Sequence, residues 1–294
     1  MILVTGGAGQ LATALAQAGG ARVRRVGRPE FDFDQPETIG AVFRAAAPKL
    51  VVNAAAWTAV DAAEKEPEAA MRANRDGPAA LARLCAAAGV PLVHVSTDYV
   101  FDGDKGSPYV ETDATHPTAV YGATKLAGEE AVLAACPQAV VLRTSWVYST
   151  TGKNFVRTML GAAQKMDRLR VVADQTGCPT SARELARAIL AVADRLQHGW
   201  QTEYGGVFHA AGSGSTTWHG LAEAVFAAAG PYGHKVPAVD AIATADWPTP
   251  ARRPPDSRLD CGKLEAVFGV RQPEWRVSVG QVVDELLGAA ATTG

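Results

Sequence analysis

The sequence has few of the features that mark several classes of protein. Only four of its 294 residues are cysteines, Cys85, Cys136, Cys178 and Cys261, and they form neither a CxxC pair nor a Cys/His cluster. This scattering indicates no disulfide framework and no zinc site, and we expect the four side chains to be reduced and packed in the core.

The chain also has a small net charge and no long apolar run. Charged residues make up 20% of the chain, the net charge is −2 and the pI is about 6.3. A chain with this balance has no strong attraction for polyanions, so we expect neither nucleic acid nor a membrane surface as a partner. No stretch approaches ~20 apolar residues, and Met1 leads straight into Ile2 without a basic segment or cleavage site. We therefore expect a cytoplasmic protein.

The sequence does contain a regular alternation of two kinds of segment. Short β-branched runs occupy 2–5, 22–26, 50–53, 92–96 and 139–143, and alanine-rich helical segments occupy 10–18, 37–47, 67–88 and 120–135. This alternation predicts an α/β fold, a Rossmann-type doubly wound parallel sheet, over residues 1–145. Residues 146–294 have Pro/Gly-rich loops and helical composition at 181–196, 216–229 and 278–287. They predict a smaller C-terminal substrate-binding lobe, with some segments returning to the first domain.

The first strand ends in a glycine turn, Gly6-Gly7-Ala8-Gly9-Gln10-Leu11. Gly6 permits a tight turn, Gly9 lets the backbone approach a pyrophosphate, and the following helix offers free N–H groups. The spacing departs from GxGxxG, so a plain strand-to-helix turn is the alternative. Because the turn opens a β/α series, it favours a dinucleotide site.

The end of the second strand bears on the choice of cofactor. Arg28 stands where an arginine can neutralise the 2′-phosphate of NADP, whereas an acidic residue there would accept the ribose hydroxyls of NAD. The nearby Glu30 weakens this interpretation, and a surface arginine without a role is the alternative. We expect NADPH, with NADH as the second possibility.

Three polar side chains form a candidate catalytic group. Tyr121 and Lys125 are four residues apart on a predicted helix and so share one face. A nearby ammonium stabilises a phenolate and brings its pKa toward the working range. Thr97, at the carboxyl end of a central strand, can hydrogen-bond the same substrate oxygen. A YxxxK pair alone can also be a surface feature, so the order of all three motifs carries the prediction.

The chain resembles the extended short-chain dehydrogenase/reductases, and within them the dTDP-4-dehydrorhamnose reductase family. The resemblance covers nearly the whole chain and is carried by GGAGQL at 6–11, VNAAAWTAVDAAE at 52–64, STDYVFDG at 96–103, YGATKLAGE at 121–129, RTSWVY at 143–148, NF at 154–155, DQTGCPT at 174–180, and RP at 253–254 with SRLD at 257–260. The STDYVFDG and RTSWVY blocks are much more specific than the glycine turn or YxxxK.

The resemblance implies an NAD(P)H-dependent oxidoreductase that transfers hydride to C4 of a dTDP-6-deoxy-4-ketohexose. Tyr121 would donate the proton, Lys125 would hold the cofactor ribose and lower the tyrosine pKa, and Thr97 would orient the keto oxygen. The cofactor would contact Gly6, Gly9, Gln10, Leu11, Arg28, Asp32, Phe33, Ala55, Ala56, Thr58, Tyr121 and Lys125. The sugar nucleotide would contact Val60, Thr97, Asp98, Tyr99, Trp146, Asn154 and Arg253. For Trp146 the alternative is a core aromatic, and for Arg253 a solvated loop residue.

One departure from the family concerns metal. Some members are described as dimers bridged by magnesium through an acidic residue early in the first helix, where this chain has Thr13-Ala14-Leu15. The sequence therefore does not support a magnesium site, and it leaves a monomer or a homodimer open.

Two other functions remain as alternatives. The first is another nucleotide-sugar epimerase, dehydratase or reductase. The second is a non-catalytic nucleotide-binding regulatory subunit of the same fold, like the one associated with methionine adenosyltransferase. The presence of Thr97, Tyr121 and Lys125 together favours an enzyme over the regulatory subunit.

Overall fold

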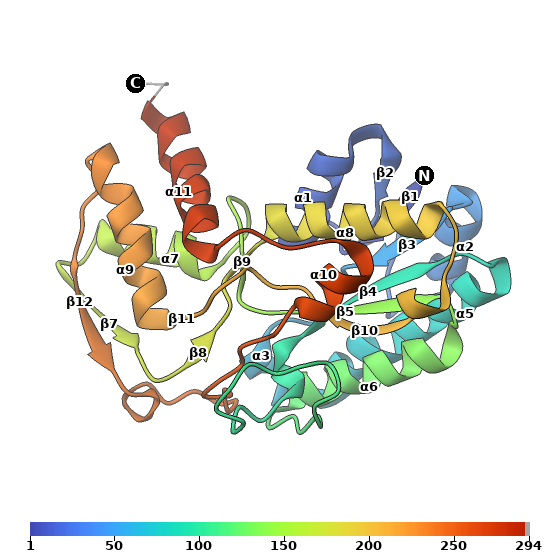
Figure 1. The fold of residues 1–294 in the computed structure, drawn as a ribbon, viewed down its shortest axis with the longest axis horizontal. Coiled ribbons are helices and arrows are strands. Elements are labelled where there is room, and N and C mark those ends of the chain that lie inside the picture. Colours follow the sequence, from blue (N-terminus) through green and yellow to red (C-terminus); the bar gives the residue numbers. More distant parts are fainter. Residues whose placement is uncertain (292–294) are drawn as a thin grey trace.

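Six strands form one parallel sheet in the computed structural model, which describes residues 1–291 (Figure 1). Their order across the sheet is β10-β5-β4-β3-β1-β2, so the chain changes direction of winding between β1 and β3. Ligands of open α/β sheets bind at such a reversal. The strands are β1 (Ile2–Thr5), β2 (Val23–Arg25), β3 (Leu50–Asn53), β4 (Leu92–Thr97), β5 (Ala139–Thr144) and β10 (Gly206–His209).

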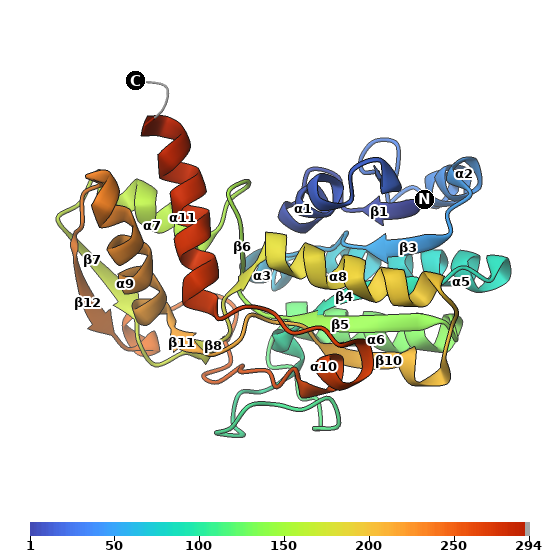
Figure 2. The ribbon, with the colours of Figure 1, turned by 45° about the horizontal axis from the view of Figure 1, so that its top comes forward.

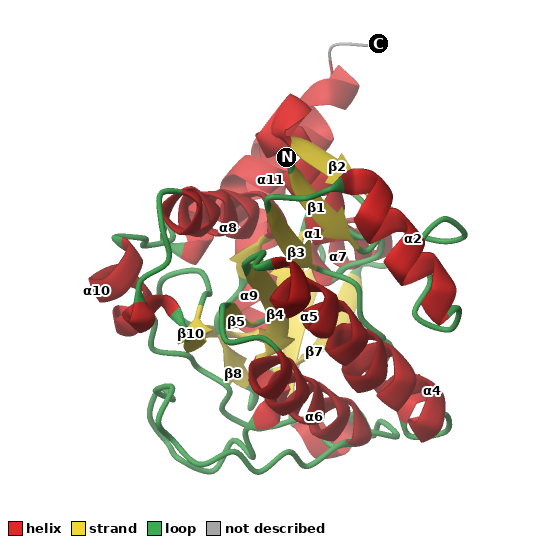
Figure 3. Cartoon of the chain, turned by 90° about the vertical axis from the view of Figure 1, so that its right-hand side faces the viewer, coloured by secondary structure: helices red, strands yellow, loops and turns green. Residues whose placement is uncertain are grey.

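Helices cover both faces of this sheet (Figure 3). On one face lie α1 (Gln10–Gly19) and α8 (Ala182–Gln197), whose apolar side chains pack together over β1, β3 and β5. On the other face lie α2 (Pro36–Ala46), α5 (Gly77–Ala88) and α6 (Val120–Ala135), which cover Leu3, Val51 and Leu92. The strands are buried on both faces because of these layers, which explains their continuous apolar runs. The α/β fold with its doubly wound parallel sheet is confirmed.

The segment 67–88 differs from the single helix that its alanine content predicts. It forms α4 (Pro67–Met71), a π-helical turn at Arg72–Asp76, and then α5. Pro78 has no N–H, so the carbonyl of Asn74 loses the helical partner it would otherwise have. Gly128 of α6 packs against that carbonyl, because an added Cβ would come within 2.0 Å of its oxygen. The irregular turn therefore brings α6 close to this segment.

The second half of the chain builds a separate apolar cluster beside the sheet domain (Figure 2). Its helices are α7 (Phe155–Ala163), α9 (Trp218–Ala229) and α11 (Trp275–Ala291), and they pack around the fully buried Trp275. Its short strands are β6 (Val147–Tyr148), β7 (Arg168–Val172), β8 (Thr176–Gly177), β9 (Thr180–Ser181), β11 (Thr216–Thr217) and β12 (Ala238–Ile242), in the pairs β6/β9, β7/β12 and β8/β11. The short α3 (Val60–Ala63) lies near α6.

Three segments of the second half lie on the sheet domain. Strand β10 pairs with β5, α8 packs on α1, and α10 (Gly262–Phe268) packs against β10 and α8. The chain therefore crosses between its two apolar regions several times after residue 145.

The structure also shows the state of the cysteines and the apolar character of the helices. All four cysteines are free; Cys85, Cys136 and Cys178 are buried, and Cys261 is partly buried. Within residues 1–291, none of the helices combines the length and apolarity needed to span a bilayer.

Candidate active site

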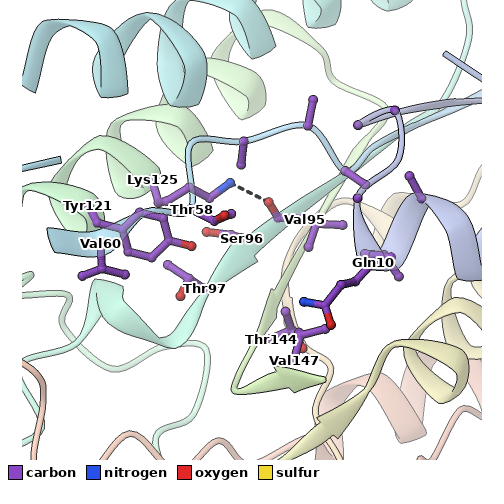
Figure 4. Close-up of a pocket in the computed structure, with 18 of the residues that line it drawn as sticks. Gln10, Thr58, Val60, Val95, Ser96, Thr97, Tyr121, Lys125, Thr144 and Val147 are labelled. Carbon is purple, nitrogen blue, oxygen red and sulfur yellow. Dashed lines mark hydrogen bonds between the residues drawn. The ribbon is translucent and has the colours of Figure 1, made fainter. Parts of the chain in front are cut away.

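A cleft of about 780 Å³ opens at the carboxyl ends of β1, β3, β4 and β5. Strand ends of a parallel sheet meet at one edge, so residues far apart in the sequence converge there. All predicted site residues except Asn154 and Arg253 line the cleft: Gly6, Gly9, Gln10, Leu11, Arg28, Asp32, Phe33, Ala55, Ala56, Thr58, Val60, Thr97, Asp98, Tyr99, Tyr121, Lys125 and Trp146. Figure 4 shows Tyr121, Thr97 and Lys125 on one side of it and Gln10 on the other.

The glycine turn forms one wall of the cleft. Gly6 has φ +105°, and an added Cβ there would come within 2.8 Å of the Ala54 oxygen, so only glycine fits between the ends of β1 and β3. Gly9 precedes α1 without a side-chain cap, and its N–H donates to the Gly6 oxygen. The first N–H groups of α1 thus have no capping side chain, and the turn can cradle an anion.

Arg28 lines the cleft beyond β2, but its charge is shared with two carboxylates. Its Nε donates to Asp32 Oδ1 at 2.9 Å and its Nη2 to Asp34 Oδ2 at 3.0 Å, while the side chain stays 68% exposed. A 2′-phosphate would therefore compete with Asp32 and Asp34 for this guanidinium. Phe31 and Phe33 form an edge-to-face pair in the same part of the cleft.

The three predicted catalytic side chains lie together in the cleft (Figure 4). Tyr121 is in the first turn of α6, and burial raises its pKa to about 12, an effect that hydrogen bonding to Thr97 opposes. Lys125 Nζ donates to the Val95 oxygen at 2.7 Å. Burial lowers the lysine pKa to about 8. Burial is the largest cause of the Tyr121 shift, and the expectation that Lys125 lowers the tyrosine pKa stays a prediction.

A buried ionic network lies one helical turn beyond Lys125. Glu129 accepts from Ser96 Oγ at 2.5 Å and from Arg143 through Nε at 2.9 Å and Nη2 at 2.7 Å. Glu129 and Arg143 are almost fully buried, so each charge depends on the other for compensation. The Glu129 charge also opposes the fall in the Lys125 pKa. This network ties α6 to β4 and β5 directly behind the cleft.

Asp98 is a buried carboxyl group at the floor of the cleft. Burial raises its pKa to about 6, although hydrogen bonds from Ser257, Ser145 and Thr97 counteract the effect. Ser145 Oγ donates to it at 2.9 Å and Thr97 Oγ1 at 3.1 Å. The three hydroxyl groups fix the orientation of the carboxylate beside Tyr121.

Trp146 lines the cleft in a left-handed backbone conformation, with φ +45°. Its ring stacks on Trp218 with centroids 3.5 Å apart and planes inclined by 6°. A Cβ on Gly177 would lie 2.4 Å from Cε2, 2.7 Å from Nε1 and 2.8 Å from Cζ2, the last two both bonded to Cε2. A point in the ring plane would lie nearer to those neighbours than to Cε2, so Gly177 sits over the ring face. Trp146 is thus packed between Trp218 and Gly177, so both faces of its ring are covered and only the edge of the ring faces the cleft.

Asn154 is placed differently from the expectation that it contacts the substrate. It is buried, caps α7 by accepting from the Arg157 N–H, and donates through Nδ2 to Gln10 Oε1 at 2.9 Å. It is not among the residues that line the cleft. An asparagine directly before Phe155-Val156 has the sequence pattern of a helix cap, and that signal could have been read.

Arg253 also lies outside the cleft lining. It forms a two-pronged ion pair with Asp61 of α3, with Nη1 to Oδ1 at 2.7 Å and Nη2 to Oδ2 at 2.9 Å. The guanidinium lowers the pKa of the Asp61 carboxyl group. The pair connects the loop after β12 to α3.

Several cleft residues were missed by sequence reasoning: Gly27, Phe31, Val95, Ser96, Thr144, Ser145, Val147, Lys153 and Trp218. Ser96 and Ser145 lie within the blocks STDYVFDG and RTSWVY, so those blocks were the signal for them. Trp218 and Lys153 reach the cleft through the second apolar region, and no local pattern marks them. Among residues 1–291, no group of three or more His, Cys, Asp or Glu side chains could hold a metal ion.

Comparison with known proteins gives a consistent set of relatives. Residues 1–287 match the family model described as RmlD substrate binding domain. A dTDP-4-dehydrorhamnose reductase of Sinorhizobium fredii is 48% identical over 97% of this chain and 97% of its own. The crystal structure of a dTDP-4-dehydrorhamnose reductase from Clostridium acetobutylicum has a TM-score of 0.90 and 35% identity, covering 97% of this chain and 99% of that one. The Bacillus anthracis dTDP-4-dehydrorhamnose reductase in complex with NADP has a TM-score of 0.88 and 30% identity, with 97% and 98% coverage.

Proposed function

The chain belongs to the RmlD substrate binding domain family, and from this membership we infer that it is an NADPH-dependent reductase of dTDP-4-dehydrorhamnose. The product is dTDP-L-rhamnose. The observation that carries this conclusion is the meeting of Thr97, Tyr121 and Lys125 in one cleft with the glycine turn.

The residues of the cleft fit a nicotinamide dinucleotide. Gly6 leaves room that any Cβ would fill, and the start of α1 offers uncapped N–H groups for a diphosphate. Ala55 and Ala56 line the same wall with small side chains. We assign the diphosphate to the glycine turn, the adenine side to Asp32 and Phe33, and the nicotinamide ribose to Tyr121 and Lys125. When bound, the dihydronicotinamide supplies the hydride for C4 of the sugar.

Tyr121 supplies the proton. The phenol is protonated at neutral pH, as an ordinary tyrosine is, so it is available as an acid to the keto oxygen. Thr97 holds that oxygen through its hydroxyl group. Loss of the proton leaves a buried phenolate, which the charged form of Lys125 stabilises. Lys125 therefore acts on the product of the proton transfer.

The sugar occupies the part of the cleft between Val60, Asp98, Tyr99 and Trp146. The Asp98 carboxylate accepts hydrogen bonds from sugar hydroxyls, and the aromatic edge of Trp146 packs against the apolar side of the deoxysugar. Trp218 supports Trp146 from behind.

The deciding experiment mixes the purified protein with dTDP-4-dehydro-L-rhamnose and NADPH and follows the loss of nicotinamide absorbance. We expect one NADPH to be oxidised per sugar, and Tyr121→Phe to lose most of the rate. An epimerase or dehydratase would convert sugar nucleotides without net use of NADPH, and a regulatory subunit would bind cofactor without turnover. Either result would replace the reductase assignment.

We further propose a cytoplasmic enzyme that works as a monomer or a homodimer. The first turns of α1 carry no acidic residue, so a magnesium bridge between two subunits has no support in the sequence. Light scattering after size-exclusion chromatography, with and without magnesium, distinguishes these states.

A further inference from the structure

A loop from the second apolar region is fastened to the glycine turn. This clamp loop, residues 149–154, joins β6 to α7. Ser149 Oγ and Asn154 Nδ2 both donate to Gln10 Oε1, each at 2.9 Å, and Ser149 and Asn154 are buried. An added Cβ on Gly152 would come within 3.1 Å of Gln10 Cγ. The clamp loop is thus held directly against the first residue of α1.

The two hydrogen bonds fix the orientation of the Gln10 amide. Because Oε1 accepts from the clamp loop, Nε2 is left as a donor, and no hydrogen bond from it is formed within residues 1–291. Figure 4 shows this nitrogen turned toward the side of the cleft that holds Tyr121 and Lys125. The clamp loop therefore presents a hydrogen-bond donor from the helix that follows the glycine turn.

The same loop places a cation in the cleft. Lys153 lines the cleft, is exposed, and forms no ion pair or hydrogen bond through its side chain in the described part of the chain. The other two cations of the lining are engaged: Arg28 pairs with Asp32 and Asp34, and Lys125 is buried against the Val95 oxygen. Lys153 is therefore the uncommitted positive charge beside the glycine turn.

We propose that Lys153 is a cofactor-binding residue whose ammonium group neutralises the diphosphate of NADPH at the glycine turn. The inference rests on the proposed use of NADPH. A diphosphate brings two negative charges, and backbone N–H groups alone supply only partial charges to meet them. The tether to Gln10 places Lys153 at the cofactor and not at the sugar nucleotide, because α1 begins where the cofactor diphosphate lies.

The test measures the dissociation constants of NADPH, NADH and dTDP by titration calorimetry for the wild-type protein and for Lys153→Gln and Lys153→Arg. Lys165→Gln is the matched control, because it removes the same charge from an exposed residue just after α7, which does not line the cleft. We expect Lys153→Gln to weaken NADPH and NADH by about tenfold each, since both share the diphosphate, and to leave dTDP unchanged. Lys153→Arg and Lys165→Gln should stay within about twofold of wild type.

Three results would overturn the proposal. A change below about twofold in both cofactors, equal to the control, would show that Lys153 carries no binding energy. A loss confined to NADPH would assign Lys153 to the 2′-phosphate, and a loss confined to dTDP would assign it to the substrate. If the wild-type protein itself binds neither cofactor, the proposed function fails, which is distinct from failure of the lysine assignment.

Discussion

Gly177→Ala tests the packing of Trp146 by adding a single methyl group. Gly177 lies in β8 with an ordinary backbone conformation, so alanine meets no dihedral strain there. The new Cβ would, however, stand 2.4 Å from Cε2 of Trp146, closer than real Cβ atoms approach anything. On the opposite face Trp218 is already in contact at 3.5 Å between centroids. The indole has no free direction along its normal, so the substitution must displace it.

The expected cost follows from overpacking. Adding a methylene to a tightly packed site costs roughly 1–3 kcal/mol, which for a chain of this size lowers Tm by several degrees. Displacing Trp146 also moves the edge that it presents to the sugar. We therefore expect KM for the keto sugar nucleotide to rise about tenfold, equal to ~1.4 kcal/mol, while the NADPH dissociation constant stays within about twofold.

Thermal unfolding and steady-state kinetics supply both readouts, and Gly161→Ala is the matched control. Gly161 lies in α7, in the same part of the molecule, and an added Cβ there meets nothing within 4 Å. Alanine at this helical position should raise stability by about 0.5–1 kcal/mol. In the double variant Gly177→Ala/Trp146→Phe, the smaller ring should recover part of the lost stability, with a coupling energy of about 1 kcal/mol.

The reasoning fails if Gly177→Ala raises Tm as Gly161→Ala does and leaves KM unchanged, because the indole ring would then have space to accommodate the methyl group. It also fails if Trp146→Phe lowers Tm strongly without affecting KM. That result would make Trp146 a core residue and would remove it from the sugar site.

Other predictions concern proton transfer, charge and the cofactor. Tyr121→Phe should lower kcat by roughly 10²–10⁴-fold with little change in NADPH affinity, as stopped-flow kinetics and a binding titration would measure. Because the folded pKa of Lys125 is about 8 against 10.5 unfolded, kcat should fall as pH rises through 8, while unfolding free energy rises between pH 8 and 10.5 as the cost of the buried charge is relieved. The folded pKa of Asp98, about 6 against 3.8, implies that its buried charge costs stability as pH rises from 4 to 6; Asp98→Asn should remove that slope in urea unfolding. Arg28→Ala should weaken NADPH more than NADH in paired titrations, and equal losses would refute its role at the 2′-phosphate.

The central sheet was predictable because its signals are local. The runs at 2–5, 50–53, 92–96 and 139–143 are β-branched and bounded by turns, and each forms a strand within one residue of its expected limits. Helix 120–135 begins and ends as its composition predicts. Strand β10 (Gly206–His209) was missed, because it lies outside the regular alternation and its partner β5 is distant in sequence. Its pairing depends on the chain returning to the sheet, which no local pattern encodes.

The same difference between local signals and long-range packing separates the predicted site residues from the missed ones. Residues at the ends of successive parallel strands are brought together by the topology, so a motif at each strand end is sufficient to place them. Lys153 and Trp218 instead come from the second apolar region, and their positions depend on how that region lies beside the sheet domain. Trp218 stacks on Trp146, although no sequence motif links these two residues.

Arg253 shows how a tertiary contact can change the role that a residue type suggests. A loop arginine near a nucleotide site suits a phosphate because its guanidinium offers two parallel donors. Here Nη1 and Nη2 both meet Asp61, and Nη1 also reaches the Ala251 oxygen at 2.7 Å, so this edge of the guanidinium is already engaged. A diphosphate that used the same edge would have to break a two-pronged pair and leave Asp61 without its cation. The contact instead fastens the loop after β12 to α3, whose first residue, Val60, lines the cleft. We therefore expect Arg253 to act on the site by holding one of its walls.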